Sequence, residues 1–457
     1  MTLSTPKHSD CISPEPGTQL RLSRFRVDVT PPTGHPLCGG WLEPAVAVSD
    51  HLYALGVVLI GYGKPVVLCV VDWCEIANQS HIAWRMLLAD AGGTTPDRVA
   101  VHTMHPHCTP WPDQEAQRLV AMEVGVGHLM DPVWCDNALN RVASAVRDSV
   151  RRAEPFTHVG LGKAKVDQVA SNRRIIGDNG KIKAMRLTRT PDPLVRAEPE
   201  GLIDPWLKTI SFWNEHQKLA SLHYYAVHPT SYDNDRTITP DFTGLARERR
   251  TANEPDVLHA YFTECAGNIA AGKYNDGARE NRRVLTDRIY RAIVQSEQQI
   301  ERIAVNEFSW HTAPVTLPPR EDISDEELWN ILTSAHRSNR DRIQAAMQLS
   351  YRSRLKDPIL LSRLSFGDAA HILHLPGESF IEYQLLAQSF LPSKWMAVAS
   401  YGDCGPGYIC LQRSFDEGGY EPTDSFVAGK SEAIMRQAIT ELLNEELSVH
   451  TVERQLQ

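Results

Sequence analysis

The feature that most constrains the fold is an alternation of strand and helix patterns, which runs from residue 22 to the C-terminus. Such alternation is typical of α/β proteins, and we predict mixed β-sheets flanked by helices. A length of 457 residues would by itself suggest about three domains, but no shift in composition marks a linker. We therefore expect one large domain over residues 21–457, preceded by a disordered tail at residues 1–20.

Several elements can be placed from local patterns. Apolar runs joined by short polar turns predict three β-hairpins, at Ala54–Tyr62 with Pro65–Val71, Thr209–Trp213 with Lys218–Val227, and Leu364–Phe366 with Ala369–Leu375. Helical periodicity predicts helices at Ile82–Ala91, Asp136–Arg152, 278–303 and Lys430–Glu446. Ser324-x-x-Glu327 matches a capping box and opens a helical excursion at 320–356, which we expect to break once.

Charge and hydropathy argue against two classes of partner. The net charge is −9 without a basic stripe, which disfavours nucleic acid. No apolar run reaches the ~18–20 residues of a transmembrane helix, and the N-terminus lacks the apolar core of a secretory signal. Nine cysteines without a CxxC pair favour reduced thiols and a cytoplasmic location, although a secreted mature form would also lack a signal. A homo-oligomer is compatible with the sequence.

The densest chemical pattern is a histidine-rich segment that follows a predicted strand at Arg98–His102. It places His102, His105 and His107 within six residues. Neutral imidazole is the commonest metal ligand near pH 7. In extended backbone His105 and His107 would point to the same side, so one could bind a metal while the other orients a substrate or a water molecule. The same pattern also fits a polar loop whose histidines bond to the backbone.

Three later segments each place a polar side chain where a predicted strand ends. His228 follows Leu222–Val227, Glu378 follows His371–Pro376, and Tyr408 lies in a Gly-rich turn. Taken singly, each is more typical of a structural or exposed side chain than of a site.

Taken together, these segments resemble the neutral/alkaline non-lysosomal ceramidase family over roughly residues 24–430. The resemblance rests on motifs in the family's order: Arg26-Val-Asp28-Val-Thr30-Pro31-Pro32, Val70-Val71-Asp72, His105-Pro-His107-Cys-Thr-Pro110, Ala226-Val-His228-Pro-Thr-Ser231, Pro376-Gly377-Glu378, and the pair Gly407-Tyr408 and Gly419-Tyr420-Glu421.

The resemblance implies a zinc-dependent amidohydrolase that cleaves the carbon–nitrogen bond of an N-acyl substrate. It implies that His105, His228, Glu378 and Tyr408 hold Zn²⁺, with His105 preferred over His107 because the first histidine of the loop is the family's ligand. Two imidazoles and one carboxylate leave the ion a net positive charge and an open position, which suits activation of water. His107 would then steer the water or protonate the leaving amine. Tyr420 would stabilise the oxyanion as the second catalytic residue.

Two further roles are less specific. Asn172-Arg173 resembles a segment near the family's substrate cleft, where the guanidinium could hold a polar or anionic group; a surface salt bridge would explain it equally well. Asp72 could accept a hydrogen bond from the ring nitrogen of a ligating histidine that does not bind the metal, or it could cap the end of a strand.

The chain departs from the family at positions that affect the substrate. Ala270 replaces a serine that has been considered as a nucleophile, so this position cannot form a covalent intermediate. Nothing near Cys265 in the sequence would hold it as a thiolate, so it is not expected to act as the nucleophile instead. Direct attack by activated water is therefore favoured. Thr109 and Trp111-Pro112 replace glycines, which should reshape the mouth of the cleft. The extra β-sandwich domain of longer ceramidases is not expected here. These differences predict a substrate smaller and more polar than ceramide. A zinc esterase or lactonase acting on a small polar substrate, and a non-catalytic binding descendant, are the alternatives.

Overall fold

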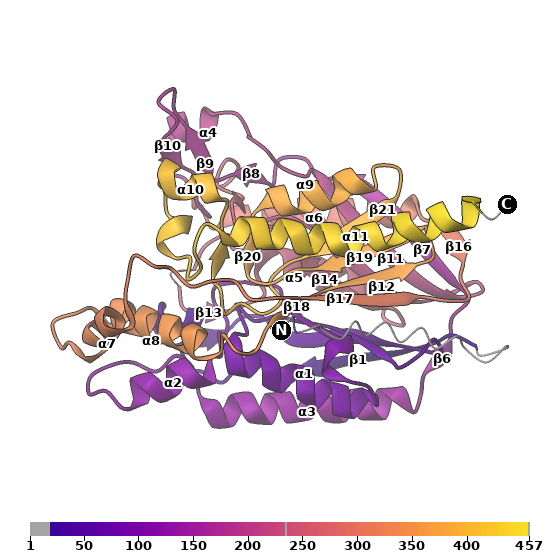
Figure 1. Ribbon diagram of the computed structural model, residues 1–457, viewed down its shortest axis with the longest axis horizontal. Coiled ribbons are helices and arrows are strands. Elements are labelled where there is room, and N and C mark those ends of the chain that lie inside the picture. Colours follow the sequence, from indigo (N-terminus) through magenta and orange to yellow (C-terminus); the bar gives the residue numbers. More distant parts are fainter. Residues whose placement is uncertain (1–18, 234, 456–457) are drawn as a thin grey trace, which may run out of the picture.

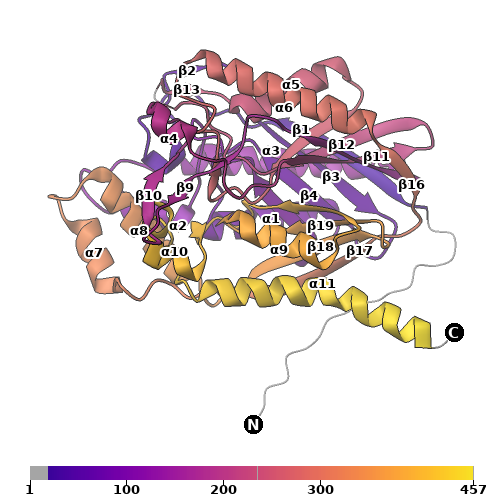
Figure 2. The same ribbon diagram turned by 90° about the horizontal axis from the view of Figure 1, so that it is seen from above.

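The computed structural model describes residues 19–233 and 235–455, with side chains described as far as residue 444. Three β-sheets surround a continuous apolar core, and each sheet is covered on its outer side by helices. Figure 1 shows α1 and α3 along one side and α9 and α11 along the opposite side, and Figure 2 shows α5 and α6 on a third side. The prediction of one α/β domain with mixed sheets is confirmed. Apart from residues 19 and 20, the predicted tail lies outside the described residues.

The first sheet has the strand order β5-β4-β3-β1-β6. Its strands are β1 (Arg21–Asp28), β3 (Tyr53–Ile60), β4 (Val66–Val71), β5 (Val99–Thr103) and β6 (Glu154–Pro155). The predicted hairpin is confirmed, because β3 and β4 pair antiparallel. β4 and β5 pair parallel. The outer helices are α1 (Asn78–Gly92) and α3 (Pro132–Val150), with α2 (Gln114–Ala121) beside them.

The second sheet has the order β14-β12-β11-β7-β16. It consists of β7 (His158–Lys165), β11 (Trp206–Asn214), β12 (Gln217–Tyr225), β14 (Leu258–Thr263) and β16 (Glu301–Ala304), covered by α5 (Asp241–Asn253) and α6 (Glu280–Gln298). The predicted helix at 278–303 was too long at its C-terminal end. The last residues of that range instead pair with β7 as an edge strand, a contact that helical periodicity does not report.

The third sheet has the order β17-β18-β19-β21. It is built from β17 (Ser309–Val315), β18 (Ile359–Phe366), β19 (Ala370–His374) and β21 (Trp395–Ala399), and is covered by α9 (Ile381–Phe390) and α11 (Ser431–Gln455). The predicted excursion is a pair of helices, α7 (Asp325–Thr333) and α8 (Asn339–Ser353), and the capping box at Ser324 is present. These helices lie at one end of the molecule (Figures 1 and 2).

The remaining elements are short. They are η1 (Cys38–Gly40), β2 (Ala47–Val48), η2 (Pro96–Arg98), β8 (Ser171–Asn172), β9 (Arg174–Ile176), β10 (Ile182–Met185), α4 (Pro193–Ala197), β13 (Thr237–Ile238), β15 (Ile269–Ala270), β20 (Glu378–Ser379), β22 (Tyr408–Ile409), α10 (Gln412–Glu417) and η3 (Glu421–Thr423). Figures 1 and 2 show β9, β10, α4 and α10 toward the end of the molecule that carries α7 and α8. Within the described part of the chain, no helix is both long and apolar enough to cross a bilayer. The eight described cysteines are free and buried; a cytoplasmic location stays a prediction.

Candidate metal centre

Each of the three sheets contributes one strand end to a single cluster. Each sheet contains one parallel pair, β4 with β5, β12 with β14, and β19 with β21. His105 follows β5, His228 follows β12 and Glu378 follows β19. Ligand sites in α/β proteins form outside the carboxyl ends of parallel strands. The fold therefore collects these three side chains although they are far apart in the sequence.

The backbone at His105 is held in an unusual conformation. Its φ angle is 73°, in the left-handed region that costs a non-glycine residue about 1–3 kcal/mol. Its N–H donates to the Trp73 carbonyl at 2.9 Å, which fixes the start of the histidine loop against the end of β4. This strained conformation directs the imidazole into the interior of the protein, where His105 is only 3% exposed.

The side-chain nitrogens of the cluster lie at the separations expected of ligands to one ion. The Nε2 atom of His228 is 3.1 Å from Nε2 of His105 and 3.1 Å from Nε2 of His107. Oε2 of Glu378 is 3.4 Å from Nε2 of His105. Two ligands at the corners of a tetrahedral zinc site, each ~2.0–2.1 Å from the metal, are roughly 3.3 Å apart. The three imidazoles of His105, His107 and His228 thus have the spacing of ligands to one metal ion, and Glu378 belongs to a second, overlapping group with Glu75 and His105. The His228 nitrogen that faces Oε2 of Glu378, at 3.8 Å, is Nδ1.

The hydrogen bonds behind the rings bear on where the protons are. Nδ1 of His105 lies 3.0 Å from the Cys74 carbonyl, which only accepts, so this Nδ1 carries the proton and Nε2 of His105 presents a lone pair. Nδ1 of His228 lies 3.5 Å from the Ala266 carbonyl and 3.4 Å from the Tyr401 hydroxyl, which can donate or accept. In the tautomer of His228 that donates to Ala266, the two Nε2 lone pairs face each other at 3.1 Å, and a cation between them would remove their repulsion.

The charge states of the two histidines agree with a role as metal ligands. Burial lowers the pKa of His105 and of His228 well below the usual value, so both rings are neutral, as metal ligands must be. Burial, opposed by Arg173, raises the pKa of Glu378 to about 8, so without a cation nearby this carboxyl group holds its proton at neutral pH. Among the described residues, Oε2 of Glu378 has no hydrogen-bond partner. A buried carboxylate oxygen left without a donor is costly, and a metal ion would remove that cost.

Tyr408, Tyr420 and Arg173 complete the cluster. β22 pairs parallel with β20, which places Tyr408 beside Glu378. Arg173 is 4% exposed and donates through Nη1 to the Tyr408 hydroxyl and the Gly267 carbonyl, both at 3.0 Å. The rings of Tyr408 and Tyr420 meet edge to face at 5.8 Å. The predicted substrate-binding guanidinium is therefore inside the site, between the two tyrosines and not on the surface.

His107 differs from His105 in the partner of its Nδ1 atom, which is a carboxylate and not a backbone carbonyl. Nδ1 of His107 faces the Asp233 carboxylate at 3.3 Å. Burial lowers the pKa of His107, but the hydrogen bond with Asp233 and nearby charges raise it overall to about 9. His107 is also more open, with 22% of its side chain exposed. The distances alone leave both histidines within reach of an ion; the hydrogen bonds favour the buried, neutral His105 as the ligand and the charged His107 as an acid.

Two predicted residues face away from the cluster. Asp72 forms both hydrogen bonds of a bidentate pair with Arg247, at 2.5 and 2.9 Å, and accepts the Tyr53 N–H. The carboxylate behind His105 is instead Glu75, whose Oε1 is 3.6 Å from Nδ1. The side chain of Asn172 bonds to backbone groups, donating to the Leu202 carbonyl and accepting from the N–H of the second residue along. A substrate contact for Asn172 stays a prediction.

Several residues that surround the candidate centre were not predicted from the sequence. Glu75 is fully buried, and neither of its oxygens has a partner among the described side chains and backbone. Tyr401 lies against His105, with ring centroids 4.5 Å apart. The only signal for Glu75 was its place three residues after Asp72, at the end of the same strand. Tyr401 and Asp233 carried none.

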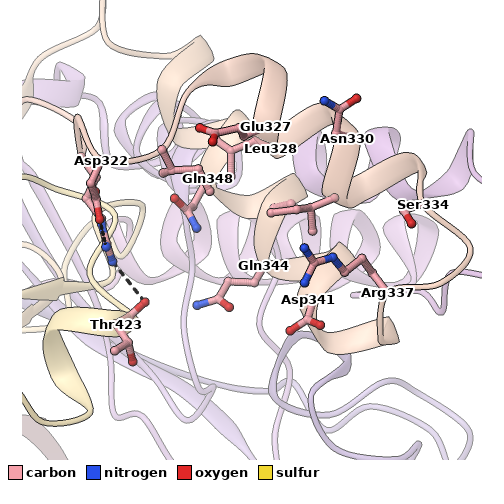
Figure 3. A pocket seen from close by; sticks show the side chains of 14 residues that line it. Asp322, Glu327, Leu328, Asn330, Ser334, Arg337, Asp341, Gln344, Gln348 and Thr423 are labelled. Carbon is pink, nitrogen blue, oxygen red and sulfur yellow. Dashed lines mark hydrogen bonds and ion pairs between the residues drawn. The ribbon is translucent and has the colours of Figure 1, made fainter.

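A separate cavity lies beside the centre, at the end formed by α7 and α8. Its volume is about 620 Å³, and its lining includes Gln344, Gln348 and Thr423 but none of the candidate ligands. In Figure 3 the two glutamine side chains extend from the helices toward the segment that carries Thr423. Most of its lining residues are polar, and one of them, Thr423, lies three residues after Tyr420 in the sequence.

Comparison with known proteins identifies the fold. No protein-family model matches the sequence, and no curated protein matches it. The structure is similar to that of neutral ceramidase from Pseudomonas aeruginosa, with a TM-score of 0.64 and 16% identity, over 93% of this chain and 74% of that one. It is similar to a structure described as ceramidase complexed with C2, with a TM-score of 0.63 and 14% identity, over 93% and 75% of the two chains. The protein therefore has a neutral ceramidase-like fold, as the motifs predicted.

Proposed function

We propose that the protein is a zinc-dependent hydrolase that cleaves the carbon–nitrogen bond of an N-acyl substrate. The observation that carries the proposal is the group of three imidazoles, His105, His107 and His228, whose Nε2 atoms converge, with that of His105 beside an oxygen of Glu378 that lacks a hydrogen-bond partner among the described residues. This arrangement is built for a cation. Its setting on a neutral ceramidase-like fold supports an amide as the scissile bond.

The ligands would be His105, His228, Glu378 and Tyr408. A zinc ion bound there would polarise the substrate carbonyl and lower the pKa of a water molecule. Arg173 holds the Tyr408 hydroxyl in place at 3.0 Å. Burial keeps the pKa of Tyr408 well above its usual value, so it meets the site as a neutral phenol.

His107 and Tyr420 supply the remaining functions. His107, in its charged form, would orient the attacking water and donate a proton to the leaving nitrogen, while Asp233 fixes the orientation of its ring. The Tyr420 hydroxyl is hydrogen-bonded to the Asp424 carboxylate. When a substrate binds, that single proton turns to the carbonyl oxygen and stabilises the charge that develops there.

The attacking group in this proposal is water and not a side chain. Ala270 offers no hydroxyl at the position of the family's serine. Cys265 is fully buried, and burial raises its pKa well above the usual value, so it is held as an unreactive thiol. The same groups could also cleave an ester, so ester and amide substrates have to be compared.

The test measures metal content and turnover together. Protein purified without a metal-affinity tag should contain about one zinc per chain by plasma mass spectrometry and should hydrolyse N-acyl amides in a chelator-sensitive way. Glu378→Ala should lose most of the metal and the activity. Glu326→Ala, at an exposed position in α7, should lose neither. A wild type that takes up no zinc when it is offered would refute the proposal, and activity on esters alone would replace amidase with esterase.

A further inference from the structure

A half-exposed arginine lies near the candidate centre, beside Asp424, which in turn interacts with Tyr420. Arg340 is in the first turn of α8, and 52% of its side chain is exposed. Its Nη2 atom is 3.8 Å from Oδ1 of Asp424, the carboxylate that hydrogen-bonds the Tyr420 hydroxyl. The helical excursion thus brings a permanent positive charge next to the catalytic tyrosine.

Aromatic rings hold this guanidinium in place. Its central carbon lies 4.5 Å from the ring centroid of Trp41, and Trp41 packs against Trp111 at 5.4 Å. Trp111 belongs to the histidine loop, four residues after His107. The indole N–H groups of both tryptophans lack a hydrogen-bond partner within the part of the chain that the structure describes. A guanidinium stacked on an aromatic wall is oriented before a ligand arrives.

Asp424 accepts its hydrogen bonds from residues other than Arg340. Asp424 already accepts from Gln344 Nε2 at 2.8 Å, from Thr423 Oγ1 at 3.2 Å and from Tyr420. Gln344 and Thr423 also line the cavity of Figure 3, so Asp424 is supported from that side. Among the described residues, Arg340 donates no hydrogen bond and has no other ion pair. The N–H donors of the Arg340 guanidinium are therefore available to bind a ligand.

The other arginines of α8 are used differently. Arg342 donates to the Leu332 carbonyl at 2.6 Å, and Arg352 donates to the Ile323 carbonyl at 2.7 Å. Both tie α8 to the preceding segment. Arg340 is directed instead toward the centre, where it influences Tyr420 and Asp424 electrostatically. A role in holding the helices together does not account for its position.

We infer that Arg340 is a specificity-determining residue that binds a carboxylate on the substrate, so that the substrate class is the N-acyl amino acids and not neutral lipid amides. This inference rests on the proposed function. In an N-acyl amino acid the carboxylate lies one carbon beyond the amide nitrogen. If the carbonyl oxygen accepts from Tyr420, a carboxylate that points past Asp424 would meet the Arg340 guanidinium. A bidentate guanidinium–carboxylate pair supplies both affinity and orientation.

The test compares two substrates that differ only in this charge, an N-acylglycine and the matching N-acylglycinamide, on zinc-loaded full-length protein. The wild type should prefer the acid. Arg340→Gln should lower kcat/KM for the acid by about 10- to 100-fold, mainly through KM, with little change for the amide. Arg340→Lys should restore part of the loss. Arg337→Gln, which removes a charge three residues earlier, should leave both substrates unaffected.

Two results would overturn the inference: equal losses for both substrates in Arg340→Gln, or a wild type that prefers the neutral amide. If neither substrate is hydrolysed, the proposed function fails, but the inference can still be decided by binding. Quenching of the tryptophan fluorescence by N-acylglycine should then be weaker in Arg340→Gln than in the wild type, and identical titrations would end it.

Discussion

The buried pair between Asp72 and Arg247 yields the sharpest test of which residues serve the fold and which serve the site. Both side chains are fully buried, and two hydrogen bonds of 2.5 and 2.9 Å join them. Arg247→Met removes one partner and leaves a carboxylate in the core with the Tyr53 N–H as its remaining donor. Breaking a buried pair in this way costs about 3–5 kcal/mol, a large part of the 5–15 kcal/mol that is typical of a whole protein.

The assay is urea unfolding followed by far-UV circular dichroism, together with zinc content. Arg247→Met should shift the midpoint strongly downward, and the double variant Asp72→Asn/Arg247→Met should recover most of the loss because no unpaired charge is left. Arg249→Met is the matched control on the same helix. Its ion pair with Asp287 is exposed, so it should cost no more than about 1 kcal/mol.

Two outcomes would refute this reasoning. If Arg247→Met is as stable as the wild type, the pair does not hold β4 to α5. If the double variant folds with normal stability but no longer retains zinc, Asp72 acts on the metal centre after all, as one of the two sequence-based interpretations proposed.

Three further predictions follow from single contacts. Glu75→Gln, which replaces the buried carboxyl group 3.6 Å behind His105, should weaken zinc binding by about 10- to 100-fold in a chelator competition; unchanged affinity would show that the Cys74 carbonyl alone holds the ring. Ser324→Ala removes the capping box of α7 and should cost about 1 kcal/mol by urea titration, without loss of zinc. Burial, opposed by Lys208, raises the pKa of Glu264 to about 7, so the folded state retains a proton that the unfolded chain releases. Stability should therefore fall as pH rises from the ordinary value of 4.5 toward 7, and a Glu264→Gln variant with the same slope would contradict this.

Local sequence patterns predicted secondary structure correctly where residues close together in the sequence determine it. The β3–β4 hairpin, the buried face of α6 with Leu285, Ile289 and Ile293, and the capping box of α7 all formed as predicted. Periodicity reports which face of an element is apolar, and a cap needs only the residues of one turn. The same rule failed at the end of α6, where pairing with β7 replaced the last helical turn.

The sequence by itself determined the α/β class and the order of the strand ends that carry His105, His228, Glu378 and Tyr408, because each motif is short and contiguous. Only the tertiary structure decided which charges meet. It paired Asp72 with Arg247, 175 residues away, placed Glu75 and Asp233 behind the two loop histidines, and brought Arg340 on α8 next to Asp424. These contacts join segments whose spacing along the chain carries no information about distance. They are fixed only when three sheets close around one core and bring their strand ends to the same place.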